Sequence, residues 1–306
     1  KDYDNSIDPL IEKTWTPYDF ENSDIDLFLD ELTIDKSVKV SPIKGGYSNA
    51  QNRLNEFIEK GYSDYAQYRS DPSKKASSEM SPYFHYGQIS THEVFEKIIQ
   101  HEKWSPEKIN PSLAGRREGW WGGTLNMESF LDELITWREL GYHTCVRRAN
   151  YNQYSSLPEW AIKTLDEHSS DTRDHVYNLE ELTYSQTHDE IWNAAQNQLR
   201  EEGVIQNYLR MLWGKKILEW SPNPQIALSY MISLNDRYSL DGRDPNSYSG
   251  VFWVLGRYDR AWGPERKIYG KIRYMTSDSA ARKFNLKPYM EKWGNSPDLI
   301  GSSFSK

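Results

Sequence analysis

A glutamate and a tryptophan four residues apart, Glu133 and Trp137, are a pair whose residue types and spacing could support chemistry. Residues four apart lie on one face of an α-helix, so a carboxylate and an indole would share one wall of a pocket. The carboxyl group could hydrogen-bond an uncharged polar ring while the indole stacks on it. The same spacing is common in ordinary surface pairs, so the pair alone does not identify a site.

Three other tryptophans, Trp192, Trp213 and Trp220, have a spacing that suits a row of indoles. Trp213 and Trp220 are seven apart, which places them on the same side of one helix. Closely spaced indoles can pass an electron stepwise between solvent and a buried acceptor. Tryptophans at helical spacing are also typical of a hydrophobic core, and both interpretations stay open on the residues alone.

A third cluster, residues 234–246, combines amide, carboxylate and guanidinium side chains. Gly242 and Pro245 favour a turn at this point, so the cluster lies where a helix ends. Such a density of polar groups indicates either a bound polar ligand or a network of ion pairs at a helix terminus.

The elements that must position these residues are helices. Amphipathic periodicity predicts helices, and sustained period-two alternation is absent. The predicted segments are residues 49–60, 90–103, 127–141, 156–168, 187–200, 204–220 and 224–235. We therefore predict an all-α fold with no parallel sheet.

Two helix starts carry their own sequence signals. Thr187 and Glu190 match a capping box that would open the helix ending near Arg200. Pro224, directly after Asn223, suits the first turn of the next helix.

The first 42 residues differ in character from the rest of the chain. They are acidic, contain three prolines and show only one short apolar helical stretch, near residues 25–32. We predict an acidic linker or packing arm at residues 1–42 and a helical domain at residues 43–306. Within that domain, residues 104–126 read as a loop, and its Trp120 and Trp121 could stack on nucleic-acid bases or fold back on the body.

Composition limits the possible chemistry. Of the 306 residues, 14% are aromatic, which suits a protein that surrounds flat rings. The single cysteine, Cys145, excludes intramolecular disulfides and cysteine-ligated zinc or iron–sulfur clusters, so we expect no metal and an organic or aromatic redox centre. No apolar run of about 18 residues is present. We expect no membrane partner and a cytoplasmic or otherwise intracellular protein, nuclear in a eukaryote.

The formal net charge of −8 hides a strong segregation of charge along the chain. Residues 1–35 carry 11 acidic and 2 basic side chains, whereas residues 210–290 carry 14 basic and 7 acidic side chains. A basic face can bind phosphates in a protein that is acidic overall. Nucleic acid therefore stays among the possible partners.

Five motifs in order resemble the photolyase/cryptochrome flavoproteins. Residues 81–90 resemble the flavin-domain signature, and residues 130–140 resemble the helix that follows it in the family. Residues 208–220, 240–246 and 270–275 look like the class II branch, which repairs cyclobutane pyrimidine dimers in DNA. The resemblance spans nearly the whole chain.

The resemblance implies the helical FAD-binding catalytic domain of a deoxyribodipyrimidine photo-lyase, a carbon–carbon lyase, here without the family's N-terminal α/β antenna domain. Such a protein binds FAD, acts as a monomer on damaged DNA containing pyrimidine dimers, and uses blue light to drive electron transfer from reduced flavin to the dimer. The sequence then represents either a fragment or a protein that is naturally free of the antenna.

The resemblance also assigns residues to the cofactor. Those expected to contact FAD are Tyr65, Ser77, Met80, Ser81, Asn207, Arg210, Asp241 and Arg243, with Asn235 facing the flavin N5. Trp213, Trp192 and Trp220 match the class II photoreduction chain. Asn207 stands where class II proteins typically have glycine.

The remaining assignments concern DNA. Glu133, Trp137, Met211 and Trp253 match the pocket for the flipped-out dimer, and Arg260, Lys271 and Arg273 are expected to hold phosphates or fill the vacated gap. The loop at residues 253–262 is one residue shorter than is usual in class II.

Three other functions stay open at this point. A cryptochrome-like photoreceptor would keep FAD and the tryptophans but signal through a partner. Enzymes that repair the 6-4 photoproduct carry histidines where this chain has residues 206–211, which disfavours that branch. A flavin-free nucleic-acid-binding or scaffold module could use the same helical bundle.

Overall fold

The computed structural model describes Thr14 and residues 24–294 of the chain. It divides the chain into two compact units, Lys1–Val38 and Lys39–Lys306. The division predicted above, into an arm at residues 1–42 and a catalytic domain at residues 43–306, stays a prediction.

In the first unit, the described residues include helix α2 (Ile25–Glu31). Its N-cap is Asp24, whose carboxylate accepts hydrogen bonds from the backbone N–H groups of Asp26 and Leu27. This helix confirms the short apolar stretch predicted near residues 25–32.

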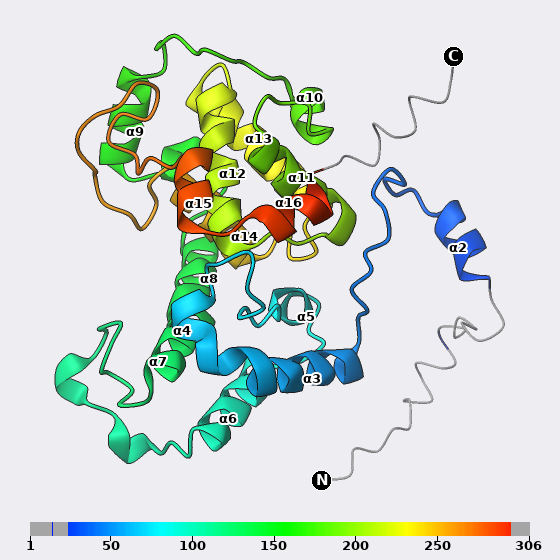
Figure 1. Cartoon of the computed structure of the whole chain (residues 1–306), viewed down its shortest axis with the longest axis vertical. Helices are drawn as coiled ribbons and strands as arrows, with labels where there is room; N and C mark the ends of the chain where they lie inside the picture. The colour runs from blue at the N-terminus through cyan, green and yellow to red at the C-terminus, as the bar shows by residue number, and fades with distance from the viewer. Residues whose placement is uncertain (1–13, 15–23, 295–306) are drawn as a thin grey trace. The chain divides into compact units, whose positions relative to one another are not determined.

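The second unit is a succession of helices (Figure 1). Its α-helices are α3 (Tyr47–Glu56), α4 (Tyr65–Tyr68), α5 (Ser81–His85), α6 (Thr91–His101), α7 (Leu125–Leu131), α8 (Arg138–Arg147), α9 (Glu159–Glu167), α10 (Leu179–Thr183), α11 (Glu190–Glu202), α12 (Asn207–Trp220), α13 (Pro224–Tyr238), α14 (Pro245–Val254), α15 (Ser277–Lys283) and α16 (Lys287–Trp293). Short 3₁₀ turns occur at Tyr62–Asp64, Pro106–Lys108, Pro111–Leu113 and Tyr154–Ser156, and π-helical segments at Phe57–Gly61 and Asp132–Trp137.

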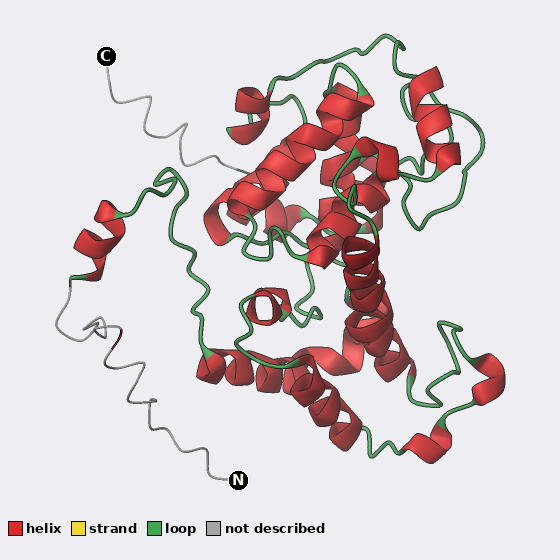
Figure 2. Ribbon diagram, turned by 180° about the vertical axis from the view of Figure 1, so that it is seen from behind, coloured by secondary structure: helices red, strands yellow, loops and turns green. Residues whose placement is uncertain are grey.

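Across residues 24–294 the only β-type pairing is an isolated bridge between Arg266 and Gly270, and Figure 2 shows helices joined by loops without a strand. The predicted all-α fold is therefore confirmed for the described chain. Within that same part, no helix combines the length and apolar character needed to span a lipid bilayer.

Each helix predicted from periodicity overlaps an observed helix, but several helices were not predicted. The missed helices are α4, α5, α10, α14, α15 and α16. Most of them are short. Helix α14 was missed because Asp244 and Pro245 were interpreted as part of a turn, whereas Asp244 caps the helix and Pro245 occupies its first turn.

One predicted helix start is confirmed and the other is wrong. Asn223 caps α13 by accepting a hydrogen bond from the N–H of Ile226, with Pro224 in the first turn. The N-cap of helix α11 lies two positions after the predicted Thr187, because Asp189 is the N-cap and accepts from the N–H of Trp192. The Thr187 hydroxyl instead donates to the side chain of Asn193, so the proposed capping box does not form.

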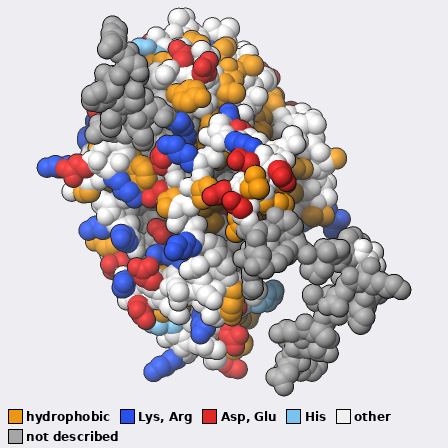
Figure 3. Space-filling model, turned by 90° about the vertical axis from the view of Figure 1, so that its right-hand side faces the viewer, with side chains coloured by type: hydrophobic (Ala, Val, Ile, Leu, Met, Phe, Trp, Pro, Cys, Tyr) orange, Lys and Arg blue, Asp and Glu red, His pale blue; other side chains and the backbone are white. Residues whose placement is uncertain are grey.

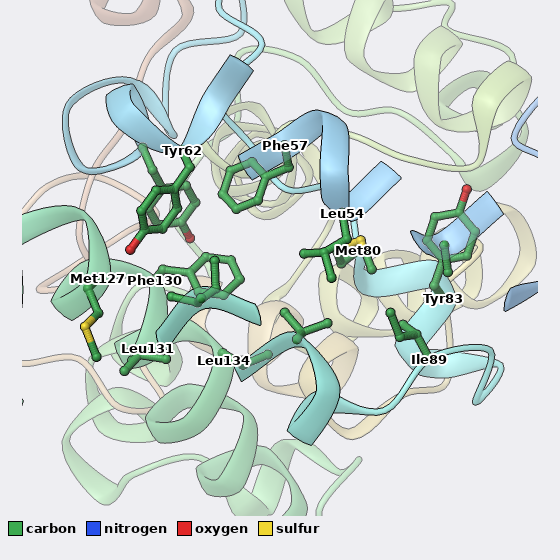
Figure 4. Close-up of a cluster of buried hydrophobic side chains, with 14 residues drawn as sticks. Leu54, Phe57, Tyr62, Met80, Tyr83, Ile89, Met127, Phe130, Leu131 and Leu134 are labelled. Atoms are coloured by element: carbon green, nitrogen blue, oxygen red, sulfur yellow. The ribbon is translucent and has the colours of Figure 1, made fainter. Parts of the chain in front are cut away.

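One hydrophobic core joins α3, α5, α6 and α7 (Figure 4). Leu54 and Phe57 recur at helical spacing and are about 1% exposed. The Phe57 ring contacts Phe130 of α7 at a centroid distance of 5.4 Å. Trp121 packs against this cluster, and its backbone oxygen accepts a hydrogen bond from Trp104. This loop tryptophan has therefore folded back on the body.

A second core surrounds α12, which contacts α11, α13 and α14. Most of α12 is buried, so its side chains contact neighbours on nearly every face. Gly214 permits the approach of α14, because a Cβ atom there would lie 2.6 Å from a Val254 methyl group. Because α12 is buried, the positions of its side chains near the candidate site are fixed by packing.

Candidate functional site

Two residues of the polar cluster predicted from the sequence, Asn235 and Asp241, lie together with Arg210 of α12. Arg210 donates to the Asn235 amide oxygen at 3.4 Å and to an Asp241 carboxylate oxygen at 3.5 Å. Asn235 is 4% exposed, and its amide nitrogen donates to Ser247 and to Asp236. The cluster is thus a connected network around a buried amide, which we call the amide cluster.

The turn after α13 makes this arrangement possible. A Cβ atom on Gly242 would lie 2.8 Å from the Asn235 backbone oxygen and 2.9 Å from that of Ser239, so only glycine fits. Arg243 follows with a φ of 67°, and its N–H donates to the Asp236 carboxylate. The strained turn carries Asp241 back toward α12.

Asp241 is ionised more readily than an ordinary aspartate. Burial raises the pKa of its carboxyl group, but the charge of Arg210 and hydrogen bonds from Ser239, Ser81 and Arg210 outweigh burial and hold the pKa below its usual value. Ser81 is the first residue of α5, so this interaction joins α5 to the amide cluster.

The other residues predicted to bind the cofactor differ in exposure. Tyr65 and Met80 are buried in the first core, at 6% and 1% exposure. Ser77 is half-buried, and its backbone oxygen accepts a hydrogen bond from Arg53. Asn207 and Arg243 are exposed. Direct interactions thus join Ser81, Arg210, Asn235 and Asp241, but none that we observe joins the remaining members to them.

The chemistry of the amide cluster fits a flat ring with a polar edge. The bonds from Arg210 to Asn235 and Asp241 are long, at 3.4–3.5 Å, so the guanidinium group has donor capacity left for a ligand. A neutral amide, a cation and a carboxylate side by side offer both donors and acceptors. These residues are compatible with the isoalloxazine edge of a flavin.

The three predicted tryptophans are buried and connected to one another, and we call them the tryptophan row. Trp213 donates from its indole nitrogen to the side-chain oxygen of Gln196 at 2.8 Å, and Trp192 donates to the backbone oxygen of Trp213 at 3.0 Å. The Trp192 and Trp220 rings lie 5.5 Å apart with an interplanar angle of 73°. All three are at most 3% exposed.

The tryptophan row begins next to the amide cluster. Trp213 follows Arg210 by three residues on α12, so the two lie on the same side of that helix. The row therefore runs from the amide cluster toward Trp220 at the far end of α12.

Glu133 and Trp137 lie in the π-helical segment Asp132–Trp137, which widens the helix between α7 and α8. Such segments are frequent at functional sites. Arg69 forms an ion pair with Glu133, and the indole nitrogen of Trp137 donates to Asp132 at 3.1 Å. The two predicted residues are thus held by separate charged partners.

A glutamine links Arg69, the partner of Glu133, to the start of α12. The side-chain oxygen of Gln206 caps α12 by accepting from the N–H of Tyr208 at 2.7 Å, while its nitrogen donates to the Arg69 backbone oxygen at 2.9 Å. One side chain therefore joins the start of α12 to Arg69, the ion-pair partner of Glu133. Met211 lies half-buried on the same helix.

Trp253 stands at the end of α14 in a group of aromatic rings and cations. The Arg273 guanidinium lies 5.0 Å from the Trp253 ring and 4.2 Å from the Trp262 ring. Two hydrogen bonds, at 2.9 and 3.0 Å, hold Arg273 to Asp259. Burial raises the pKa of Asp259, but bonds from Arg273, the Arg260 N–H and Trp262 outweigh it, so the carboxyl pKa lies below its usual value.

The cations assigned to DNA already have partners in the free protein. Lys271 pairs with Glu265 at 3.1 Å, and Arg260 lies over the Trp262 ring at 4.3 Å. Basic and acidic side chains are interspersed over the face drawn in Figure 3. Binding phosphate would therefore require Arg273 and Lys271 to exchange or share these partners.

Lys215 is a buried titratable group behind Trp253. Its ammonium group is 0% exposed, donates to the Val254 backbone oxygen and lies 5.5 Å from the Trp253 ring. Burial lowers its pKa to about 7, with Asp259 opposing the shift and Arg273 adding to it.

Sequence reasoning did not predict Arg69, Asp132, Asp259, Lys215 or Gln196 as members of this region. Asp132 could have been found from its position beside Glu133. Arg69 and Asp259 carry no local signal, because their partners are 64 and 14 residues away. Within the described residues there is no group of three or more potential metal-ligating side chains.

Comparisons with known proteins identify relatives over most of the chain, although no family model matches it. The chain is 40% identical over 257 residues to the deoxyribodipyrimidine photo-lyase of Methanothermobacter thermautotrophicus, which covers 84% of this chain and 52% of that protein. It is 38% identical over 263 residues to the deoxyribodipyrimidine photo-lyase of Potorous tridactylus, with coverage of 85% and 46%. The chain spans about half the length of the curated relatives that it matches.

The fold also matches solved structures. The crystal structure of the Synechocystis sp. PCC6803 cryptochrome aligns with a TM-score of 0.60 and 15% identity, covering 86% of this chain and 48% of that one. At this identity the likeness concerns the fold alone.

Proposed function

This chain belongs to the photolyase/cryptochrome family, and from that premise we propose that it forms the FAD-binding part of an enzyme that repairs cyclobutane pyrimidine dimers in DNA with blue light. The observation that carries the proposal is the succession of three groups along the first half of α12. The Gln206 link to Arg69, the Arg210 bonds of the amide cluster and Trp213, the start of the tryptophan row, follow one another on this helix.

When bound and reduced, FAD would supply light-driven one-electron chemistry to the dimer. The protein's part is to place and polarise the reacting groups. Arg210 and Asp241 would hold the polar edge of the flavin ring. Asn235, clamped by Arg210 and Ser247, would present a neutral amide near N5, which adds no fixed charge beside the ring.

For the dimer, we propose a pocket with Glu133 and Trp137 on one side and Trp253 on the other. A dimer is extruded from the duplex at a reduced cost because it stacks and pairs poorly. Glu133 would hydrogen-bond a base edge, and Trp137 and Trp253 would stack on the two bases. Arg273, Lys271 and Arg260 would then contact phosphates or fill the gap in the duplex.

The class II subtype is a finer proposal. Support comes from the motifs at residues 208–220, 240–246 and 270–275, and from the order in which Trp213, Trp192 and Trp220 contact one another. The proposal further includes a monomer that acts inside the cell on damaged DNA. A cryptochrome-like photoreceptor is the weaker alternative, because the relatives with 38–40% identity over most of the chain are photo-lyases by name.

The test is repair under blue light. The protein is loaded with FAD, reduced chemically and illuminated with an oligonucleotide that contains a thymine dimer, and recovery of thymine absorbance is followed. We expect repair in light only, with Trp213→Phe retaining it because the flavin is already reduced. A flavin-loaded protein that repairs nothing would contradict the proposal and favour the photoreceptor.

A further inference from the structure

A cavity of about 540 Å³ lies at the opposite end of the tryptophan row from the amide cluster. Its volume is within the range of small-molecule sites, about 300–1,000 Å³. Trp220 lines this cavity, whereas Trp192 and Trp213 do not. The cavity therefore meets the tryptophan row at its final member, a position that the proposed repair reaction does not use.

Flat rings form much of the cavity wall. The rings of His175 and His188 stack at 3.8 Å with an interplanar angle of 27°, and His188 lies 5.2 Å from Trp220. The Tyr177 hydroxyl fixes His188 by hydrogen bonds to its ring nitrogen Nδ1, at 2.8 Å, and its backbone N–H, at 3.0 Å. On another wall Tyr274 packs edge-on against a second tyrosine at 4.8 Å. These surfaces suit a planar ligand.

Among the Asp, Glu, Lys and Arg residues that line the cavity, Arg266 alone has no ion-pair partner in the described chain. Each carboxylate in its lining is paired with a lysine: Glu219 with Lys216 at 2.9 Å, Glu265 with Lys271 at 3.1 Å, and Asp174 with Lys267 at 3.2 Å. Arg266 lies over the Tyr274 ring at 4.7 Å and has no carboxylate within 4 Å among the residues that the structure describes. An exposed guanidinium beside a ring attracts planar anions.

We propose that this cavity binds a small planar anionic reductant of the ene-diol class, which returns an electron to Trp220 after the tryptophan row has given one up. The inference rests on the proposed function, because it requires the row to carry electrons.

In this step the ene-diol anion loses one electron to the oxidised Trp220 indole, which returns to its neutral form. The ene-diol also loses its remaining hydroxyl proton to a neutral imidazole of the histidine pair and leaves as the one-electron-oxidised anion. Burial lowers the pKa of His188, and the neighbouring His175 lowers it further, so an imidazole base is present at neutral pH.

The first experiment measures binding in the dark, with ascorbate as the probe and FAD-loaded, oxidised protein. The chain has seven histidines, so the imidazole proton resonances of His175 and His188 can be resolved by NMR and followed during titration. We expect saturable shifts of both, and an apparent affinity about tenfold weaker in Arg266→Gln, since a hydrogen bond to a charged group is lost. Arg282→Gln, an exposed arginine outside the cavity, is the matched control and should bind as the unaltered protein does. Absence of saturable shifts would overturn the proposal.

The second experiment follows FAD photoreduction under continuous blue light at increasing ascorbate concentration. We expect the rate to saturate in the unaltered protein and to rise linearly in Arg266→Gln, with repair by chemically reduced Arg266→Gln unchanged. A linear dependence in the unaltered protein would contradict the cavity proposal. Trp213→Phe separates the two proposals: if photoreduction survives in that variant, the electron-carrying row is wrong, whereas the dark titration reports on the cavity alone.

Discussion

The tryptophan row and the residues proposed to contact the dimer place tryptophan side chains in different surroundings. These dimer residues are Glu133, Trp137 and Trp253, and we call them the wall. In the row each indole is at most 3% exposed, and two of its N–H groups donate to uncharged acceptors, the Gln196 amide and the Trp213 carbonyl. In the wall each residue is half-buried and is held by a charged group, such as Arg69, Asp132 or Arg273. The indoles of the row are buried, which suits a path for electrons, and the Lys216 ammonium group lies 5.4 Å from the ring of its last member, Trp220. The wall keeps polar groups that can be shared with a ligand.

The largest expected effect tests whether the row is also core. Trp192→Ala should lower the free energy of unfolding by about 3–5 kcal/mol, because it empties a fully buried site. Trp253→Ala, on the half-buried wall, should cost clearly less. Urea unfolding followed by circular dichroism measures both, and equal losses would erase the difference between the two regions.

The next effect concerns the carboxylate of Glu133. Glu133→Ala should slow repair about tenfold to a hundredfold, since a hydrogen bond to a charged group contributes about 1.5–3 kcal/mol. Initial repair rates with chemically reduced flavin measure this loss. Glu133→Gln keeps the shape and one acceptor and should lose less; a Glu133→Ala variant that unfolds more easily yet repairs normally would leave Glu133 with a structural role only.

Lys215 offers a test based on pH. Its folded pKa is about 7 against an ordinary 10.5, so between these values the unfolded chain binds more protons than the folded one. The free energy of unfolding therefore gains a rising contribution with pH in that window, of up to about 1.4 kcal/mol per pH unit. Lys215→Met should remove this contribution when urea unfolding is measured at pH 7, 8 and 9. Lys60→Met, at an exposed position, should keep it, and an unchanged slope in Lys215→Met would show that Lys215 does not titrate in this range.

The smallest effect sharpens the contrast between charged and uncharged acceptors. Asp132→Asn should weaken binding of dimer-containing DNA by about threefold to tenfold. The Trp137 indole would still donate to an oxygen at position 132, but that oxygen would carry no charge, which weakens the hydrogen bond by about 0.5–1.5 kcal/mol. Fluorescence anisotropy with a labelled oligonucleotide measures the change. An Asp132→Asn variant that binds as tightly as the unaltered protein would mean that the charge on this acceptor has no influence on the wall.

The helices and most of the assigned residues were accessible from the sequence, because periodicity and family motifs are local signals. The segment at residues 204–220 was predicted to carry two tryptophans on one side of a helix, and α12 does so. The capping of α11 was predicted wrongly, because Thr187 and Asp189 are both good caps and the choice between them depends on Asn193, which holds the threonine hydroxyl.

The sequence by itself determined that the chain is helical, that its single cysteine allows neither an intramolecular disulfide nor a cysteine-ligated iron–sulfur cluster, and which tryptophans, arginines and amides carry the family's motifs. Only the tertiary structure decided which side chains hold them. Arg69 meets Glu133 across 64 residues, Lys215 lies under Trp253, and the histidine pair meets Trp220 in a cavity. Such partners are set by the packing of whole helices, because burial and electrostatics act through space and leave no mark at a fixed distance along the chain.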